Sequence, residues 1–170
     1  MLLIVCGLPG SGKTTIAEAL AKRLKAPHIS SDIIRKQMHE RPDYSEDEKR
    51  IVYKAMASRA LEMFRGGEET VVLDATYYKK EYLEMAKKAA QKAGSMMLII
   101  ECTISDKEAR KRIESRTHGP SDADFKVYLK LKGESEPIED EHLTIDCSKP
   151  VLENIERIIA YLEEMEKLDA

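Results

Sequence analysis

The segment Gly7–Thr14, which reads Gly-Leu-Pro-Gly-Ser-Gly-Lys-Thr, constrains the fold of this chain more than any other feature. It matches the pattern G-x-x-x-x-G-K-[ST], in which glycines let backbone N–H groups point inward at phosphate oxygens. An apolar run at residues 2–6 precedes the segment, and Ile16, Leu20 and Leu24 follow it at helical spacing. A glycine loop can also be a plain turn. A strand, a loop and a helix in this order nevertheless predict a phosphate-binding loop at a helix N-terminus.

The loop carries the first candidate site residues. We expect Lys13 to reach the β- and γ-phosphates of a nucleotide and the Thr14 hydroxyl to ligate Mg²⁺. No NKxD-like sequence for reading guanine is present, so we expect ATP. The expected nucleotide-binding residues are Gly7, Pro9, Gly10, Ser11, Gly12, Lys13, Thr14 and Thr15.

Short apolar runs and helical patterns alternate along the chain, which predicts an α/β fold with a parallel sheet covered on both faces. Ser45–Glu48 reads as a capping box, in which the Ser45 and Glu48 side chains each accept from the other's backbone N–H, Ser105–Glu108 reads as a helix N-cap, and Gly94 reads as a helix end. The expected strands are 2–6, 28–30, 70–74, 96–102 and 142–146. The expected helices are 13–25, 32–38, 46–65, 80–93, 105–116, 122–132 and one from Pro150 onward, with a turn at 117–121.

Ligands of such sheets bind beyond the carboxyl ends of the strands, and this rule selects Asp32 and Arg35 as the second site element. They follow the second strand three residues apart, so they share a helical face. A carboxylate there can take a proton from an attacking hydroxyl, and a guanidinium can hold an anionic acceptor. The alternative is an ordinary capping aspartate with an exposed ion pair.

Asp74 closes the third strand and is the candidate for supporting Mg²⁺ together with Thr14. It could instead pair with Arg35, orient Asp32, or cap the helix that follows. Arg112 and Arg116 lie four residues apart on the next basic helix and could neutralise a moving phosphoryl group from a lid at about 106–132. Arg110 points elsewhere and is the weaker candidate; a solvated basic face is the alternative for all three.

Composition excludes several classes of function. Of the 170 residues, 42% are hydrophobic and 35% charged, which favours a globular protein of one domain spanning 1–170. The apolar runs are far shorter than the ~20 residues of a membrane span. Cys6, Cys102 and Cys147 lack metal-ligand spacing and read as reduced thiols, so we expect a cytoplasmic protein with no membrane partner.

Taken together, Gly7–Thr14, Asp32-x-x-Arg35, Leu73–Thr76 and the arginine helix leading to Pro120–Ala123 resemble the small P-loop kinases related to phage-type polynucleotide 5′-kinases. Zeta toxins and seryl-tRNA kinases belong to the same broad group. The resemblance implies a P-loop NTPase fold with an adenylate-kinase-like sheet of order 2-3-1-4-5. It also implies that Asp32 is the general base and that Arg35 binds the acceptor phosphate.

The chemistry expected is transfer of the ATP γ-phosphate to a hydroxyl acceptor, catalysed by Lys13, Asp32, Arg35, Arg112 and Arg116. A single-stranded nucleic-acid 5′ end is the acceptor that the resemblance favours, and Lys36, Arg41, Lys49 and Arg50 could extend a groove for its backbone. Two alternatives stay open: a small-molecule kinase of the gluconate or shikimate type, and a nucleotide-dependent ATPase switch.

Overall fold

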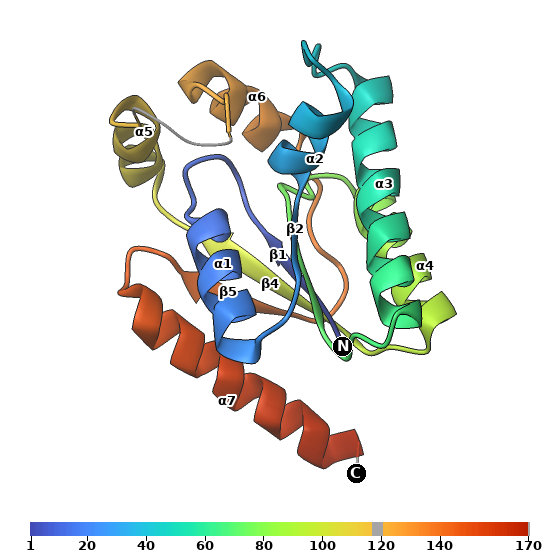
Figure 1. Cartoon of the computed structure of the whole chain (residues 1–170). Helices are drawn as coiled ribbons and strands as arrows, with labels where there is room; N and C mark the ends of the chain where they lie inside the picture. The colour runs from blue at the N-terminus through green and yellow to red at the C-terminus, as the bar shows by residue number, and fades with distance from the viewer. Residues whose placement is uncertain (117–120, 170) are drawn as a thin grey trace.

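Five parallel strands form one sheet in the order β2-β3-β1-β4-β5 (Figure 1). This is the topology expected, and the computed structural model describes it over residues 1–116 and 121–169. The central strand β1 pairs with β3, where Val5 lies opposite Asp74, and with β4, where Cys6 lies opposite Glu101. The strands are β1 (Leu2–Cys6), β2 (His28–Ser30), β3 (Val71–Asp74), β4 (Met97–Thr103) and β5 (His142–Asp146).

Helices cover both faces of the sheet, because the strands are apolar on both sides and each parallel connection needs a crossover. Helices α1 and α7 cover one face, and α3 and α4 cover the other. The helices are α1 (Lys13–Leu24), α2 (Ser31–Met38), α3 (Glu46–Arg65), α4 (Lys80–Ala93), α5 (Asp106–Glu114), α6 (Phe125–Glu134) and α7 (Val151–Asp169). Within the described ranges no helix combines the length and apolar character needed to cross a bilayer.

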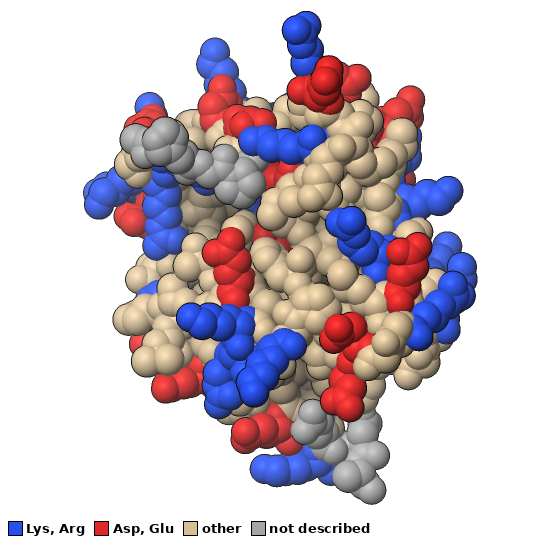
Figure 2. Space-filling model, in the orientation of Figure 1, with Lys and Arg blue, Asp and Glu red and all other residues tan. Residues whose placement is uncertain are grey.

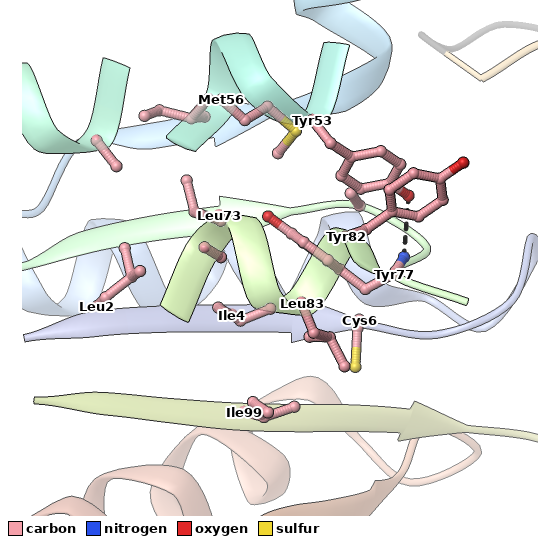
Figure 3. Packing of buried hydrophobic residues seen from close by; sticks show 14 of the residues in the cluster. Leu2, Ile4, Cys6, Tyr53, Met56, Leu73, Tyr77, Tyr82, Leu83 and Ile99 are labelled. Carbon is pink, nitrogen blue, oxygen red and sulfur yellow. Dashed lines mark hydrogen bonds between the residues drawn. The ribbon is translucent and has the colours of Figure 1, made fainter. Parts of the chain in front are cut away.

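Alternate residues of β1 serve the two cores. Leu3 and Val5 pack with α1 and α7, while Leu2, Ile4 and Cys6 pack with α3 and α4. The second core contains a group of tyrosines in which Tyr53 stacks on Tyr82 with ring centroids 4.0 Å apart (Figure 3). The Tyr53 hydroxyl accepts a hydrogen bond from the Tyr77 backbone N–H at 3.0 Å. This group joins α3 to the segment after β3 and so fixes the loop that borders the site.

The start of α6 differs from the sequence prediction. The helix begins at Phe125 rather than near 122, because the Asp124 carboxylate accepts a hydrogen bond from the Val127 backbone N–H and caps it. Asp122 lies before the helix and contacts Lys36 and Tyr44 instead. The turn expected at 117–121 falls largely outside the described residues.

A smaller apolar cluster joins α5 and α6 to the glycine loop. Ala109, Ile113 and Tyr128 form it, and Leu8 packs against them. Helix α5 therefore rests directly on the loop that opens α1. In Figure 1 both helices lie at the carboxyl edge of the sheet, where the site is expected.

Candidate active site at the carboxyl edge of the sheet

The loop between β1 and α1 has the shape of an anion cradle. Gly10 and Gly12 have φ angles of 77° and 93°, in the region that L side chains rarely adopt. Lys13 and Thr14 begin α1, so the positive end of the helix faces the loop. The sequence prediction of a strand, a glycine loop and a helix is therefore confirmed in the local structure.

A cavity of about 750 Å³ lies beside this loop and α1. Its walls come from the loop, from the segment after β5 and from α5. Arg112 and Arg116 both line it. The helix expected to reach Arg116 ends at Glu114, however, so Arg116 lies beyond α5 and the two arginines do not share a helical face as their spacing had predicted. Arg110 pairs with Glu114 at 2.7 Å and stacks on Phe125. The lining residues are Gly10, Gly12, Lys13, Thr14, Thr15, Ile16, Glu18, Arg112, Arg116, Ser121, Cys147, Ser148, Lys149, Pro150, Val151 and Asn154.

Arg112 is already held in position in this cavity. Its Nη2 donates to the Cys147 backbone oxygen at 2.8 Å, and its Nε lies 3.5 Å from Glu108 Oε1. The Arg116 Nη1 donates to the Ser121 backbone oxygen at 3.4 Å. Both guanidiniums retain further N–H groups that can face an anion in the cavity.

A second cavity, of about 270 Å³, lies on the other side of Lys13, and we call it the acceptor cavity. Lys13 and Ser121 line both cavities, so the two spaces meet at Lys13. The acceptor cavity is lined by Pro9, Lys13, Ser31, Asp32, Arg35, Tyr44, Lys49, Tyr53, Thr76, Tyr78, Ser121, Asp122, Ala123, Val127, Lys130 and Leu131.

Asp32 and Arg35 form the expected i,i+3 pair, with Arg35 Nη1 donating to Asp32 Oδ1 at 3.0 Å. The pair is not exposed: the side chains are 21% and 8% accessible. Burial raises the pKa of Asp32, and the charges of Lys13 and Arg35 oppose this rise. The reading of Asp32 as an exposed capping residue is therefore excluded by its environment.

Arg35 has a second carboxylate partner that the sequence did not reveal. Its Nε lies 3.0 Å from Glu48 Oε1, and its guanidinium stacks on Tyr44 at 4.9 Å from the ring centroid. Glu48 is buried in α3 and also accepts a hydrogen bond from the Asp43 backbone N–H at 2.7 Å. The predicted cap at Ser45 forms only in part, because Ser45 accepts from the Glu48 backbone N–H while the Glu48 side chain turns to Arg35.

Asp74 is 2% exposed at the end of β3. Its Oδ2 lies 3.3 Å from His28 Nε2, and its Oδ1 has no hydrogen-bond partner among the described residues. The alternative pair between Asp74 and Arg35 does not form, since Arg35 pairs with Asp32 and Glu48. A buried carboxylate oxygen left open is suited to a ligand that donates hydrogen bonds, such as metal-bound water.

Other loop residues lie around a third cavity of about 200 Å³, which Gly7, Ser11 and Thr103 line. The residues expected at the strand ends are thus distributed over three adjoining cavities, except Asp74, which lines none of these three. Among residues 1–116 and 121–169 no group of three or more His, Cys, Asp or Glu is arranged to hold a metal ion. Cys6, Cys102 and Cys147 are buried free thiols, as expected.

Three of the four basic residues expected to extend a nucleic-acid groove are paired with acidic side chains or buried. Lys36 pairs with Asp122 at 3.1 Å, and Arg50 pairs with Glu81 at 3.2 Å. Lys49 is buried and lines the acceptor cavity. On the face drawn in Figure 2, basic and acidic side chains are interspersed and do not form a continuous basic stripe.

The sequence analysis did not identify several residues that line the cavities. They are Tyr44, Tyr53, Tyr78 and Lys130 in the acceptor cavity, and Glu18, Val151 and Asn154 beside the loop. No motif marks them, because they come from distant elements that only the folded chain brings together. The strand-end rule could not find them, since none of them directly follows a strand.

Comparison with known proteins agrees with this architecture. The chain is 27% identical over 134 residues to an adenylate kinase of a Nitratiruptor species, in a match that covers 71% of this chain and 69% of that protein. An uncharacterized protein of Mycobacterium tuberculosis is 28% identical over 142 residues, and the match spans only 28% of its length.

Two solved structures share the fold. A gluconokinase from Sinorhizobium meliloti 1021 superposes with a TM-score of 0.76 at 20% identity, covering 98% of this chain and 94% of that one. The Mycobacterium tuberculosis APS kinase CysC, solved with AMPPNP and APS, gives a TM-score of 0.75 at 18% identity, covering 95% and 96%. The model of the AAA domain family matches residues 2–138. This chain belongs to the AAA domain family, and it shares its fold with these solved kinases.

Proposed function

We propose that this protein is an ATP-dependent kinase that phosphorylates a hydroxyl group of a small-molecule acceptor. The observation that carries the proposal is the position of Lys13 in the walls of both cavities. One cavity has the glycine loop of a nucleotide site, and the other has the partly buried carboxylate of Asp32. Two substrates bound in these cavities would meet at the lysine that contacts the transferred phosphate.

The residues around the larger cavity fit a nucleoside triphosphate. The positive φ angles of Gly10 and Gly12 leave the loop free of side chains where phosphates would lie. Lys13, Arg112 and Arg116 supply three cations. Mg²⁺ would be held by the Thr14 hydroxyl, with Asp74 Oδ1 accepting from its water, and it would neutralise phosphate charge.

In the proposed reaction Asp32 accepts the proton of the acceptor hydroxyl while the hydroxyl oxygen attacks the γ-phosphorus. The bond from the γ-phosphorus to the β-phosphate oxygen breaks, so the products are ADP and a phosphate ester. Because burial raises the pKa of Asp32, a base stronger than an ordinary aspartate faces the acceptor. Arg35, which also lies against Glu48, positions Asp32. In the proposed lid, Arg112 on α5 and Arg116 just after α5 face the phosphates.

The volume of the acceptor cavity favours a small acceptor over a polynucleotide. At about 270 Å³ it lies just below the ~300–1,000 Å³ of pockets that hold drug-sized ligands. Binding of single strands typically uses a basic groove with several aromatic platforms along it. The buried position of Lys49 and the pairing of Arg50 with Glu81 remove two members of the groove that the sequence had suggested.

The test compares wild-type protein with Asp32→Asn and the matched control Asp122→Asn. Both carboxylates line the acceptor cavity. Both oxygens of Asp122 already accept hydrogen bonds, one from Lys36 and the other from Tyr44. We expect Asp32→Asn to lower phosphoryl transfer by about 10²–10⁴-fold with little change in ATP affinity. Asp122→Asn should lower the rate of phosphoryl transfer by less than about tenfold, because a loss of that size corresponds to one ordinary hydrogen bond.

The readout is ³¹P NMR of the products with polyols, sugar acids, nucleosides and a 5′-OH oligonucleotide as separate acceptors. A phosphorylated oligonucleotide without small-molecule product would restore the polynucleotide alternative. Release of ADP and free phosphate only, whatever the acceptor, would favour the ATPase switch. Equal effects of the two substitutions would remove Asp32 from the role of base.

A further inference from the structure

One buried lysine of the acceptor cavity has no part in the reaction described above. The Lys49 side chain, on the first turn of α3, is 11% exposed and lines the cavity. Its Nζ donates to Glu46 Oε1 at 2.8 Å and to the Tyr78 hydroxyl at 2.9 Å. An ammonium group has three N–H donors, so within the described residues one donor is left for a ligand.

The charge of Lys49 is only partly balanced. Its carboxylate partner, Glu46, is shared with Lys79, whose Nζ lies 2.6 Å from Glu46 Oε2. Two ammonium groups therefore face one carboxylate. Glu46 and Lys79 are 39% and 25% exposed, so water screens their charges, whereas Lys49 is shielded from water inside the cavity wall. This arrangement leaves excess positive charge on the cavity side of the cluster.

Around Arg35, in the same cavity, negative charge exceeds positive charge. There a single cation, Arg35, lies 3.0 Å from Asp32 and 3.0 Å from Glu48. One guanidinium thus balances two carboxylates, of which Glu48 is buried and Asp32 is partly buried. The acceptor cavity consequently has an acidic group, which suits a hydroxyl that loses its proton, and a basic group, which suits an anion. Arg35 is less available than Lys49 for that anion because its charge is already shared between two carboxylates.

The remaining charges of the cavity do not cancel the excess at Lys49. Asp122 is paired with Lys36 at 3.1 Å and accepts from the Tyr44 hydroxyl at 2.6 Å. Lys130 is exposed on α6 and makes no ion pair within the part of the chain that the structure describes. Lys13 belongs to the phosphate-binding loop. Between Lys49 and Lys130 the cavity therefore offers cations on two of its walls.

We propose that Lys49 selects acceptors that carry an anionic group, a carboxylate or a phosphate, in addition to the hydroxyl that reacts. The proposal rests on the kinase function proposed above and names its class of substrate. Glu46 and Tyr78 act as positioning residues that hold the Lys49 ammonium in the cavity wall. Lys79 shares the same carboxylate but does not line the cavity, so it has no role in selection.

The test measures kcat/KM for matched acceptor pairs that differ by an anionic group: glycerol and glycerate, D-glucitol and D-gluconate, ribose and ribose 5-phosphate. The first two pairs test a carboxylate, and the third tests a phosphate. Wild-type protein should prefer the anionic member of at least one pair. In Lys49→Met the ratio of anionic to neutral kcat/KM should fall by about 10- to 100-fold, as for loss of a hydrogen bond to a charged group.

Lys79→Met is the matched control, because it removes the same charge from the same carboxylate outside the cavity. It should keep the wild-type ratio, and Lys49→Gln supplies a second variant if the methionine variant does not fold. A wild-type protein that uses neutral and anionic members equally well overturns the proposal. So does an equal change of the ratio in the Lys49 and Lys79 variants.

A binding measurement separates this proposal from the kinase function on which it rests. With saturating ADP and Mg²⁺, inorganic sulfate should raise the melting temperature of wild-type and Lys79→Met protein above that in sodium chloride of equal ionic strength. Lys49→Met should lose most of that rise. If no acceptor is phosphorylated but the Lys49-dependent sulfate effect persists, the kinase proposal fails and the anion site stands. If product forms without a Lys49-dependent sulfate effect or acceptor preference, the anion site fails alone.

Discussion

Substitution of Gly10 by alanine tests whether α5 packs on the phosphate-binding loop in solution. Gly10 has a φ of 77°, and a Cβ added there would lie 2.9 Å from the Ala109 backbone oxygen and 2.9 Å from Ile113 Cγ1. Both atoms belong to α5. The first is backbone and cannot move unless the helix moves.

Two costs add at this position. An alanine in the left-handed region costs about 1–2 kcal/mol relative to glycine. Overpacking of a filled interior typically costs about 1–3 kcal/mol more. We therefore expect Gly10→Ala to lower the free energy of unfolding by about 2–5 kcal/mol.

Gly94 provides the matched control. It ends α4 with a φ of 63°, and a Cβ there would meet no atom within 4 Å. Gly94→Ala should therefore lower the free energy of unfolding by only the backbone cost of about 1–2 kcal/mol. The effect of alanine on the unfolded chain is similar at the two positions, so the difference between the variants isolates the contact with α5.

The assay is urea unfolding of wild-type protein and both variants, with and without ADP. The free energies are compared provided that the dependence of the unfolding free energy on urea concentration, the m value, is the same for all three proteins. Gly10→Ala should be less stable than Gly94→Ala by about 1–3 kcal/mol, and it should gain less stability from ADP because a shifted α5 moves Arg112. Equal stabilities would refute the reasoning, since they would mean that α5 does not rest on the loop in the free protein.

The remaining predictions concern charged groups. Lys13→Ala should lower turnover by about 10²–10³-fold with an unchanged circular dichroism spectrum, and near-normal turnover would exclude the phosphate-binding role. Hydrogen bonds from Lys49 and Lys79 lower the pKa of Glu46 to about 2, so its stabilising effect should be present above about pH 4.5 and lost as the pH falls toward 2. Glu46→Gln should accordingly destabilise by about 1 kcal/mol or less at pH 7, because solvent screens this group, and the difference should vanish near pH 2 in unfolding titrations. Arg112→Ala and Arg116→Ala should lower turnover while changing stability by about 0.5–1 kcal/mol, and a large loss of stability at normal turnover would show a structural role.

The glycine loop, the apolar strands and the helix caps are local features, and the sequence predicted them well. The sheet order 2-3-1-4-5 came from a family resemblance, and the strand pairing confirms it. The strand-end rule placed Asp32, Arg35 and Thr76 at the acceptor cavity because parallel strands end on one edge. Arg112 and Arg116 line the same cavity, but the i,i+4 argument for them fails, because α5 ends at Glu114 and Arg116 lies beyond it.

The partners of those residues depended on contacts between distant segments. Glu48 read as half of a capping box, yet in the fold its carboxylate turns to Arg35 on another helix. Lys49 was expected to extend a groove for a nucleic-acid backbone, but the packing of α3 against the tyrosines after β3 buries it beside the acceptor cavity. Periodicity and spacing determine which face of an element a residue occupies. Only the tertiary structure decides which charge lies opposite it and how far water is excluded, and these two quantities set the strength of an electrostatic interaction.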